Sequence, residues 1–309
     1  MDIASLQKQF AGADFLTFEE INGIVRMQVK TPQASATVYL QGAHLTSYVP
    51  AGFAEVIHQG RGTNFGVGRP AGAGIPVVWP WFANDHQWFS FEPKRDRVNG
   101  KPAGSHGFAR TQEWTLTSAT RKGKDVELVL ELGPNEVSRL MGFDNFHLTM
   151  TFLIGRTLTP ALKVLNQDSK PLIYEEDFHH YFAVGDIHEV KVKGLEPTSY
   201  IDKVDGMKVK PASHAPLSFT GFVDRIYEDT TAELVIVDEM LKRHLRLRKK
   251  GSNTTVVWNP WENANNPANS EWHEFVAVEV ANAAKNTVTL PPGESRTMGV
   301  EISVENGLG

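Results

Sequence analysis

Short stretches in which apolar and polar residues alternate recur along this chain and constrain its fold more than any other feature. In 125–132, for example, Val126, Leu128 and Leu130 alternate with mostly acidic neighbours. A repeat of two residues places successive side chains on opposite faces of a strand, so such a stretch predicts a half-buried β-strand. The same pattern occurs at 25–29, 147–154, 158–165, 234–237 and 245–247.

Turn residues such as Asp205-Gly206 separate these stretches, whereas a helical pattern is limited to 3–10, 136–141 and, less clearly, 270–274. The chain has 309 residues, which is enough for one large β domain or two ordinary ones. A strand must bury its apolar face against another layer. The predicted fold class is therefore all-β, with two large packed sheets.

The composition excludes several classes of function. The net charge is −5, from 31 basic and 36 acidic residues, which argues against nucleic acid or an anionic membrane as a general partner. The chain has no cysteine, so disulfides, thiol catalysis and cysteine metal sites are excluded. The start of the chain lacks the features of a signal peptide, and no apolar run approaches the ~18 residues that span a bilayer. We therefore expect a cytoplasmic protein.

The most informative polar residues are two neighbouring histidines and one glutamate. His179 and His180 lie between aromatic residues, and Glu279 ends the apolar run 275–278. Neighbouring side chains in a strand face opposite ways, so one histidine would face a cleft. Adjacent histidines on a strand do not easily bind one ion, so we expect no metal, but an imidazole can give or take a proton near neutral pH. Glu279 could equally be an outward-facing strand residue.

Two long stretches, 60–107 and 258–272, lack a strand pattern, and long loops on a β frame commonly carry binding groups. Trp79 or Trp81 in the first of them could stack on a sugar face, although core packing explains either one equally well. His44 is more simply explained as a structural histidine.

The segment 61–110 is basic on an otherwise acidic chain. It has seven Lys or Arg and three Asp or Glu, a local charge of +4. Such a segment suggests a small anionic ligand, because arginine offers bidentate hydrogen bonds to phosphate; a solvated run of charges is the simpler alternative. The basic residues are Arg61, Arg69, Lys94, Arg95, Arg97, Lys101 and Arg110.

A series of short motifs, taken in order from about residue 20 to about 304, resembles the D-hexose-6-phosphate mutarotases. These proteins, also called glucose-6-phosphate 1-epimerases, belong to the galactose-mutarotase-like group. Each motif is weak alone, but the ordered series is specific. The motifs are Gly42-Ala43-His44, Gly74-Ile75-Pro76, Trp79-Pro80-Trp81-Phe82, His106-Gly107-Phe108-Ala109-Arg110, His179-His180-Tyr181-Phe182, Ile201-Asp202-Lys203, Asp224-Arg225-Ile226-Tyr227, Trp258-Asn259-Pro260-Trp261, Val276-Ala277-Val278-Glu279 and Leu290-Pro291-Pro292-Gly293.

The resemblance implies one β-supersandwich domain over residues 1–309, with a lead segment at 1–15, and an aldose 1-epimerase that needs no cofactor. It implies that His179 is the general acid and Glu279 the general base. It also implies that Arg110 binds phosphate or substrate and that Asp224 holds sugar hydroxyls. We add three further candidate substrate-binding residues, namely His106, Arg69 and Trp81. We also expect a monomer that acts in carbohydrate metabolism.

Three departures from the family pattern concern the phosphate. Gly72 stands where the family usually has an arginine, Ser105 where it has a glutamine, and 263–267 is rich in asparagine where the family has an Asp-rich loop. The acid/base pair is intact. We hypothesise that basic residues of the 61–110 segment compensate for the lost arginine, namely Arg69, Lys94, Arg95 or Arg97.

The predicted reaction opens the sugar ring, since Glu279 removes the proton of the C1 hydroxyl while His179 protonates the ring oxygen. Ring closure after rotation about C1–C2 gives the other anomer. Three alternatives remain: a mutarotase for an unphosphorylated sugar, a glycoside hydrolase or lyase, and a non-catalytic carbohydrate-binding domain. Hydrolysis normally needs two carboxylates, and a partner for Glu279 could come from Glu175, Glu176 or Asp177.

Overall fold

The computed structural model describes residues 2–60, 66–83, 104–262 and 270–307, together with the backbone of the short strands β6 (Arg97–Val98) and β7 (Lys101–Pro102). Within these residues the chain forms mostly antiparallel strands, which confirms the all-β prediction. Each alternating stretch of the sequence is a strand. These strands are β2 (Ile24–Lys30), β9 (Asp125–Leu132), β10 (Phe146–Ile154), β11 (Leu158–Asn166), β20 (Leu234–Asp238) and β21 (Arg243–Lys250).

Nine strands form the larger sheet, in the order β18-β15-β20-β21-β25-β11-β10-β9-β8. Buried and partly exposed residues alternate without interruption along β9 and β10, because one face of this sheet packs on the core while the other faces outward. The remaining members are β18 (Leu217–Ser218), β15 (Val190–Lys193), β25 (Ser295–Asn306) and β8 (Thr115–Lys122).

The second large sheet has the order β17-β16-β19-β22-β23-β13-β5, with β14 (Tyr181–Ala183) also paired to β23. All eight residues of β23 (Phe275–Asn282) are buried, so both faces of this strand are covered. That explains why its sequence is an apolar run and not an alternating one. The other members are β17 (Lys208–Lys210), β16 (Tyr200–Asp202), β19 (Val223–Tyr227), β22 (Thr254–Asn259), β13 (Glu176–Phe178) and β5 (Val77–Val78).

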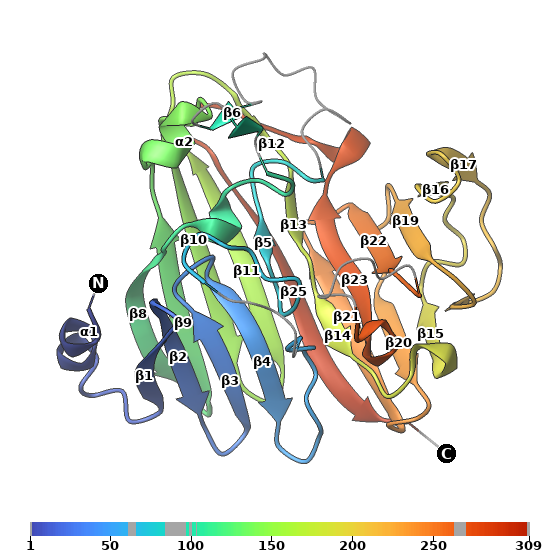
Figure 1. Cartoon of the computed structure of the whole chain (residues 1–309), viewed down its shortest axis with the longest axis horizontal. Helices are drawn as coiled ribbons and strands as arrows, with labels where there is room; N and C mark the ends of the chain where they lie inside the picture. Colours follow the sequence, from blue (N-terminus) through green and yellow to red (C-terminus); the bar gives the residue numbers. More distant parts are fainter. Residues whose placement is uncertain are drawn as a thin grey trace.

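A third, four-stranded sheet contains β1 (Leu16–Ile21), β2, β3 (Ala34–Tyr39) and β4 (His44–Pro50). Figure 1 shows it in front of β8–β11, while β22 and β23 lie in front of β20, β21 and β25. One cluster of buried apolar side chains, from Leu6 to Val304, is shared by all three sheets. A two-stranded ribbon joins β12 (Leu172–Tyr174) to β24 (Val288–Leu290).

Helices are short in the described part of the chain. Two of the expected helices are present as α1 (Ile3–Gln9) and α2 (Glu136–Leu140), each begun by a polar cap, Asp2 and Asn135 respectively. At 270–274 the structure has a single 3-10 turn, η5 (Trp272–Glu274). No helix within the described residues is both long and apolar enough to cross a membrane.

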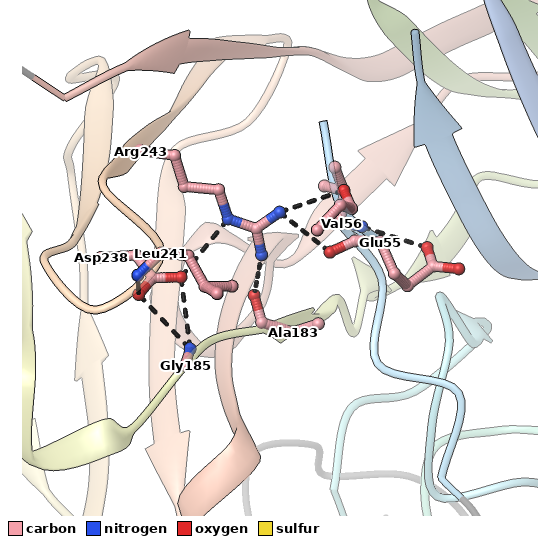
Figure 2. A network of polar contacts seen from close by, with 8 residues as sticks. Glu55, Val56, Ala183, Gly185, Asp238, Leu241 and Arg243 are labelled. Atoms are coloured by element: carbon pink, nitrogen blue, oxygen red, sulfur yellow. Dashed lines mark hydrogen bonds and ion pairs between the residues drawn. The ribbon is translucent and has the colours of Figure 1, made fainter. Parts of the chain in front are cut away.

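A buried arginine ties the two large sheets together (Figure 2). Arg243, on β21, donates from Nε to Asp238 and from its two Nη atoms to the carbonyl oxygens of Ala54, Glu55 and Ala183. Ala183 is the last residue of β14. The guanidinium therefore fixes the end of the strand that begins two residues after His179.

Candidate active site

The strand register brings the two predicted catalytic residues together. Phe178 on β13 pairs with Val280, and Tyr181 on β14 pairs with Ala277, both on β23. The same register between these pairs places His179 opposite Glu279. Residues that face each other across an antiparallel pair project on the same side of the sheet. The pairing of β13 and β14 with β23 thus brings together two residues that are a hundred positions apart in the chain.

The two side chains are in contact. His179 Nε2 lies 3.2 Å from Glu279 Oε1, and their side chains are 13% and 2% exposed. The imidazole also stacks on the ring of Tyr181, at 4.7 Å between ring centres. His180 is completely buried on the opposite face, against Phe182, as the alternation of a strand requires.

The histidine and the glutamate lie in a cavity of about 270 Å³ on one face of the second sheet. That volume is near the lower end of small-molecule sites, which are typically ~300–1,000 Å³, and it suits one monosaccharide. Several strands and the loops next to them supply its wall. The lining residues are Gly72, Phe82, His106, His179, Tyr181, Lys203, Asp224, Val256, Trp258 and Glu279.

His106 reaches the cavity from the loop just before Phe108. Its ring meets His179 edge to face at 5.5 Å, and its Nδ1 accepts a hydrogen bond from the backbone N–H of Ala83. Burial and the charges of Arg110 and Lys203 lower the pKa of His106 well below 6.5. A neutral imidazole that accepts at Nδ1 carries its proton on Nε2, so His106 presents a donor to a ligand.

Asp224 and Lys203 form an ion pair of 2.8 Å on the wall of the cavity. They come from β19 and from the residue after β16, which are neighbours in the sheet. Burial raises the pKa of Asp224, and the Lys203 ammonium opposes that shift. The pair therefore offers both an acceptor and a donor to sugar hydroxyls.

Arg110 is not among the residues that line the cavity. Its Nη2 donates to the carbonyl oxygen of Ser105 at 2.6 Å and to the Ser105 hydroxyl at 3.3 Å. Its charge is close enough to depress the pKa of His44, His106 and His179. The described contacts thus give Arg110 an electrostatic influence on the site and an anchoring contact to the His106 loop.

Burial sets the protonation of the catalytic pair. It lowers the pKa of His179 to about 3, helped by the nearby charges of Arg110 and Lys203. It raises the pKa of Glu279, again through desolvation first. Both shifts favour the neutral imidazole and the neutral carboxyl. The ion-pair form, with imidazolium and carboxylate, is reached by moving one proton over the 3.2 Å contact.

Two predicted substrate-binding residues lie elsewhere. Trp81 is 1% exposed, donates from its indole to Gly104 and packs on Phe108, so the structure assigns it to the core and not to stacking on a sugar. Arg69 is exposed, and its backbone carbonyl accepts a hydrogen bond from the side chain of Gln41, in the turn between β3 and β4. The aromatic side chains that line the cavity are Phe82, Tyr181 and Trp258.

The three acidic residues before His179 have different surroundings. Glu175 accepts hydrogen bonds from the backbone N–H groups of Phe82 and Ala284, and Glu176 accepts one from the side-chain amide of Asn282. Asp177 has the register and the burial to lie against Glu279. Lys94, Arg95 and the side chains of Arg97 and Lys101 lie outside the described residues, as do Arg61 and the Asn-rich stretch 263–267.

Sequence reasoning did not single out several residues of this site. Lys203, Tyr181 and Trp258 occur inside motifs that carry the family resemblance, yet their types alone gave no reason to place them in a cavity. Strand alternation is the signal that was available, because it puts Asp177, His179 and Tyr181 on one face. Among the described residues, no group of three or more His, Asp or Glu side chains is arranged to hold a metal ion.

Together the fold and the site define a class: a large antiparallel β-sandwich in which one imidazole and one carboxylate meet in a monosaccharide-sized cavity, as in sugar isomerases. The aldose 1-epimerase family model matches residues 26–303. The chain belongs to the aldose 1-epimerase family, and is an isomerase.

Relatives and solved structures agree with this membership. A protein of Escherichia coli (strain K12) provisionally named glucose-6-phosphate 1-epimerase is 33% identical over 261 residues, 83% of each chain. The crystal structure of YeaD from Salmonella typhimurium, described as a provisional mutarotase, has a TM-score of 0.83 with 28% identity and covers 98% of this chain and 99% of its own. The galactose 1-epimerase of Lactobacillus acidophilus NCFM, at 13% identity, shares the fold with a TM-score of 0.71 over 95% of this chain and 99% of its own.

Proposed function

We propose that this protein interconverts the α and β anomers of a hexose 6-phosphate, with glucose 6-phosphate as the first candidate. The observation that carries the proposal is the 3.2 Å contact between His179 Nε2 and Glu279 Oε1 inside the cavity. Anomerisation removes a proton from the C1 hydroxyl and adds one to the ring oxygen of the same sugar. It therefore needs one base and one acid within the span of one ring.

In the proposed mechanism the ion-pair form of the site reacts. The Glu279 carboxylate takes the C1 hydroxyl proton while the His179 imidazolium gives its proton to the ring oxygen, so the C1–O5 bond breaks and a carbonyl forms. Rotation about C1–C2 turns the other carbonyl face toward the ring oxygen, and the reverse transfers close the ring. The enzyme ends with the protons it began with, so the reaction needs no other reactant.

Neighbouring groups hold the sugar in this scheme. The Asp224–Lys203 pair binds ring hydroxyls, and His106 donates from Nε2 to a sugar oxygen. Trp258 and Tyr181 supply aromatic faces for sugar C–H groups. Arg110 acts through its charge, which disfavours imidazolium and so makes His179 a stronger acid once it is protonated.

A 6-phosphate as the natural substrate is supported by the names of the relatives and by the basic segment 61–110. We further propose that Arg95 and Arg97 bind this phosphate. Reversing both charges should raise KM for glucose 6-phosphate and leave KM for glucose unchanged. An equal change for both sugars would contradict the proposal.

An unphosphorylated hexose is the second candidate, and one observation favours it. The cavity is lined by Gly72 and not by an arginine at that position. Among the described lining residues, the cationic side chain is Lys203, which is already paired with Asp224. Polarimetry on freshly dissolved α-glucose 6-phosphate and α-glucose, measured in parallel, separates the two. A larger kcat/KM for the phosphate supports the first proposal, and a larger value for glucose supports the second.

Hydrolysis is disfavoured by the position of the second carboxyl. Retaining glycosidases hold their two carboxyls ~5–5.5 Å apart, with the sugar between them, and inverting enzymes hold them farther apart. Asp177 is instead a completely buried, diagonal neighbour of Glu279 on the same face of the sheet and does not line the cavity, so it does not face Glu279 across a bound sugar. A purely binding domain would show sugar-dependent tryptophan fluorescence without faster anomerisation.

We also propose that the protein is a cytoplasmic monomer, which sedimentation and fractionation would test.

A further inference from the structure

Three consecutive carboxyl groups, Glu175, Glu176 and Asp177, have no exposed surface. Two of them have clear structural partners. Glu175 accepts backbone hydrogen bonds from Phe82 and Ala284, and Glu176 accepts one from the Asn282 side chain. Asp177 receives no hydrogen bond at either oxygen from the N–H and O–H donors of the described residues. A buried carboxylate without donors is costly, so its presence needs a reason.

The strand register places Asp177 beside the catalytic base. It pairs with Ala281, two residues along β23 from Glu279, so the two acids are diagonal neighbours on the same face of the sheet. Both side chains are buried, and each carboxyl influences the pKa of the other. Glu279 Oε2 likewise has no donor among the described residues.

Two ionised carboxylates in contact repel each other and cannot form a hydrogen bond, whereas a single proton between them satisfies both. We propose that Asp177 keeps a proton at neutral pH and donates it in a hydrogen bond to Glu279, which holds the catalytic base in its ionised form. Asp177 is thus a positioning residue that acts through Glu279 and does not touch the sugar.

The surrounding charges agree with this assignment of the proton. Burial and the neighbouring Glu279 both raise the pKa of Asp177 well above its ordinary value. Glu279 has more groups that favour its charged form, because the Asp177 hydrogen bond and the Lys203 ammonium lower its pKa while Asp224 raises it. Burial raises the pKa of the Tyr181 hydroxyl, and the nearby carboxyls of Glu279 and Asp177 raise it further. The proton therefore stays on Asp177 while Glu279 is the first of the two to ionise.

This inference rests on the proposed function, since it explains how Glu279 becomes a base at a depth where burial favours its neutral form. When Glu279 takes the C1 hydroxyl proton, Asp177 keeps its own proton, and the hydrogen bond weakens because its acceptor is no longer charged. The bond thus stabilises the reactive ion-pair form of the site. Without it, a larger fraction of Glu279 would be protonated at neutral pH.

The kinetic test compares two substitutions through the acidic limb of kcat/KM against pH, which reports ionisation of Glu279. Asp177→Ala removes the donor, so the limb should move to higher pH by about one to two units, the value of one hydrogen bond to a charged group. Asp177→Asn keeps an N–H donor of similar size and should leave the limb within about half a unit. Glu176→Gln is the matched control, because it neutralises a buried neighbouring carboxyl on the other face.

Opposite shifts would overturn the proposal. If Asp177 is ionised, removing its charge lowers the pKa of Glu279, and both variants move the limb to lower pH. An unmoved limb in Asp177→Ala would show that the contact has no influence on the base. Circular dichroism melts of each variant check that the fold is retained, and Asp177→Asn remains informative if Asp177→Ala does not fold.

A second measurement does not depend on catalysis. Carbon-13 NMR of the aspartate side-chain carboxyls, with the Asp177 signal assigned by its absence in Asp177→Asn, follows the titration directly in the wild-type protein. A signal at the position of a protonated acid at pH 7 supports the proposal even if the proposed sugar activity is absent. Titration of Asp177 below pH 5 overturns it even if the enzyme is active.

Discussion

Two buried polar groups in this protein differ in how completely their atoms are partnered. In the Arg243 cluster of Figure 2, each guanidinium nitrogen donates to an acceptor, and the Asp238 carboxylate accepts from the backbone N–H groups of Gly185 and Leu241. In the catalytic cavity, His179 Nδ1 and Glu279 Oε2 have no conventional donor or acceptor partner among the described residues. The side chains of Arg243, Asp238 and Glu279 are at most 2% exposed, and that of His179 is 13% exposed.

This difference in partnering suggests that the Arg243 cluster contributes to stability and the cavity residues to function. A fully partnered buried network stabilises one arrangement of the strands, whereas unpartnered buried atoms cost stability, a cost that is common at functional sites. Arg243 connects the loop at Ala54 to the end of β14, so it also supports the strand that carries Tyr181. The expected result is that mutations in the cluster affect folding and mutations in the cavity affect turnover.

The largest effect is expected for Glu279→Gln. Loss of the base should reduce kcat for anomerisation by about 10²–10⁴-fold, whereas the melting temperature should stay the same or rise, because a neutral amide is cheaper to bury than a carboxylate. Polarimetry and thermal melts measure the two effects, with His179→Ala as the matched loss of the acid. Near wild-type rates in either variant would remove the basis for the catalytic pair.

Arg243→Met should show the reverse behaviour. Removing one partner of a buried, hydrogen-bonded ion pair leaves Asp238 without its counter-charge and typically costs about 3–5 kcal/mol of unfolding free energy. Urea unfolding measures this loss, while kcat of the folded fraction should fall far less than in Glu279→Gln. A variant that is stable but inactive would contradict the division between the two groups.

Glu176 tests whether an incompletely partnered carboxyl outside the cavity also costs stability. Burial raises its pKa to about 7 in the folded protein, from about 4.5 when unfolded. The folded state therefore binds more protons, and the cost of ionising Glu176 grows from pH 4.5 to 7 and is constant above. Glu176→Gln should equal the wild type near pH 4 and be more stable above pH 7, by at most about 3 kcal/mol. Equal stability at both pH values would mean that Glu176 ionises normally.

The smallest effect is expected for an ion-pair network on the surface. Arg248 contacts Glu233 at 2.7 Å and Glu301 at 2.9 Å, but its side chain is 55% exposed. Arg248→Gln should change the unfolding free energy by less than about 1 kcal/mol, and salt should reduce that difference further. A loss as large as that of Arg243→Met would show that burial is not what distinguishes the two arginines.

Much of the β framework could be predicted because it depends on the alternation of apolar and polar residues along short stretches of the sequence. The alternation in 125–132 and 147–154 reappears as β9 and β10 with the expected buried faces. The 3-10 turn at Trp272–Glu274 was less predictable, because a few residues carry too weak a pattern to distinguish helix types. The extent of the domain, 1–309, remains a prediction.

The candidate site was predicted in its chemistry and less well in its members. His179, Glu279, His106 and Asp224 are together on the cavity wall. Trp81 is buried and does not line the cavity, and its neighbours in the sequence do not decide whether its indole faces the core or a cavity. Lys203 was not predicted for a related reason. Its place in the site depends on an ion pair with Asp224, which lies on an adjacent strand.

By itself, the sequence determined which side chains share a face, because the period of a strand is a property of consecutive residues. It also determined the kinds of chemistry available, by supplying histidines and acids but no cysteine. Only the tertiary structure decided that His179 meets Glu279 and that Asp177 lies beneath the same carboxyl, since strand pairing joins residues a hundred positions apart. Their protonation was decided there as well, because the energy of a charge depends on how much water the packed sheets exclude.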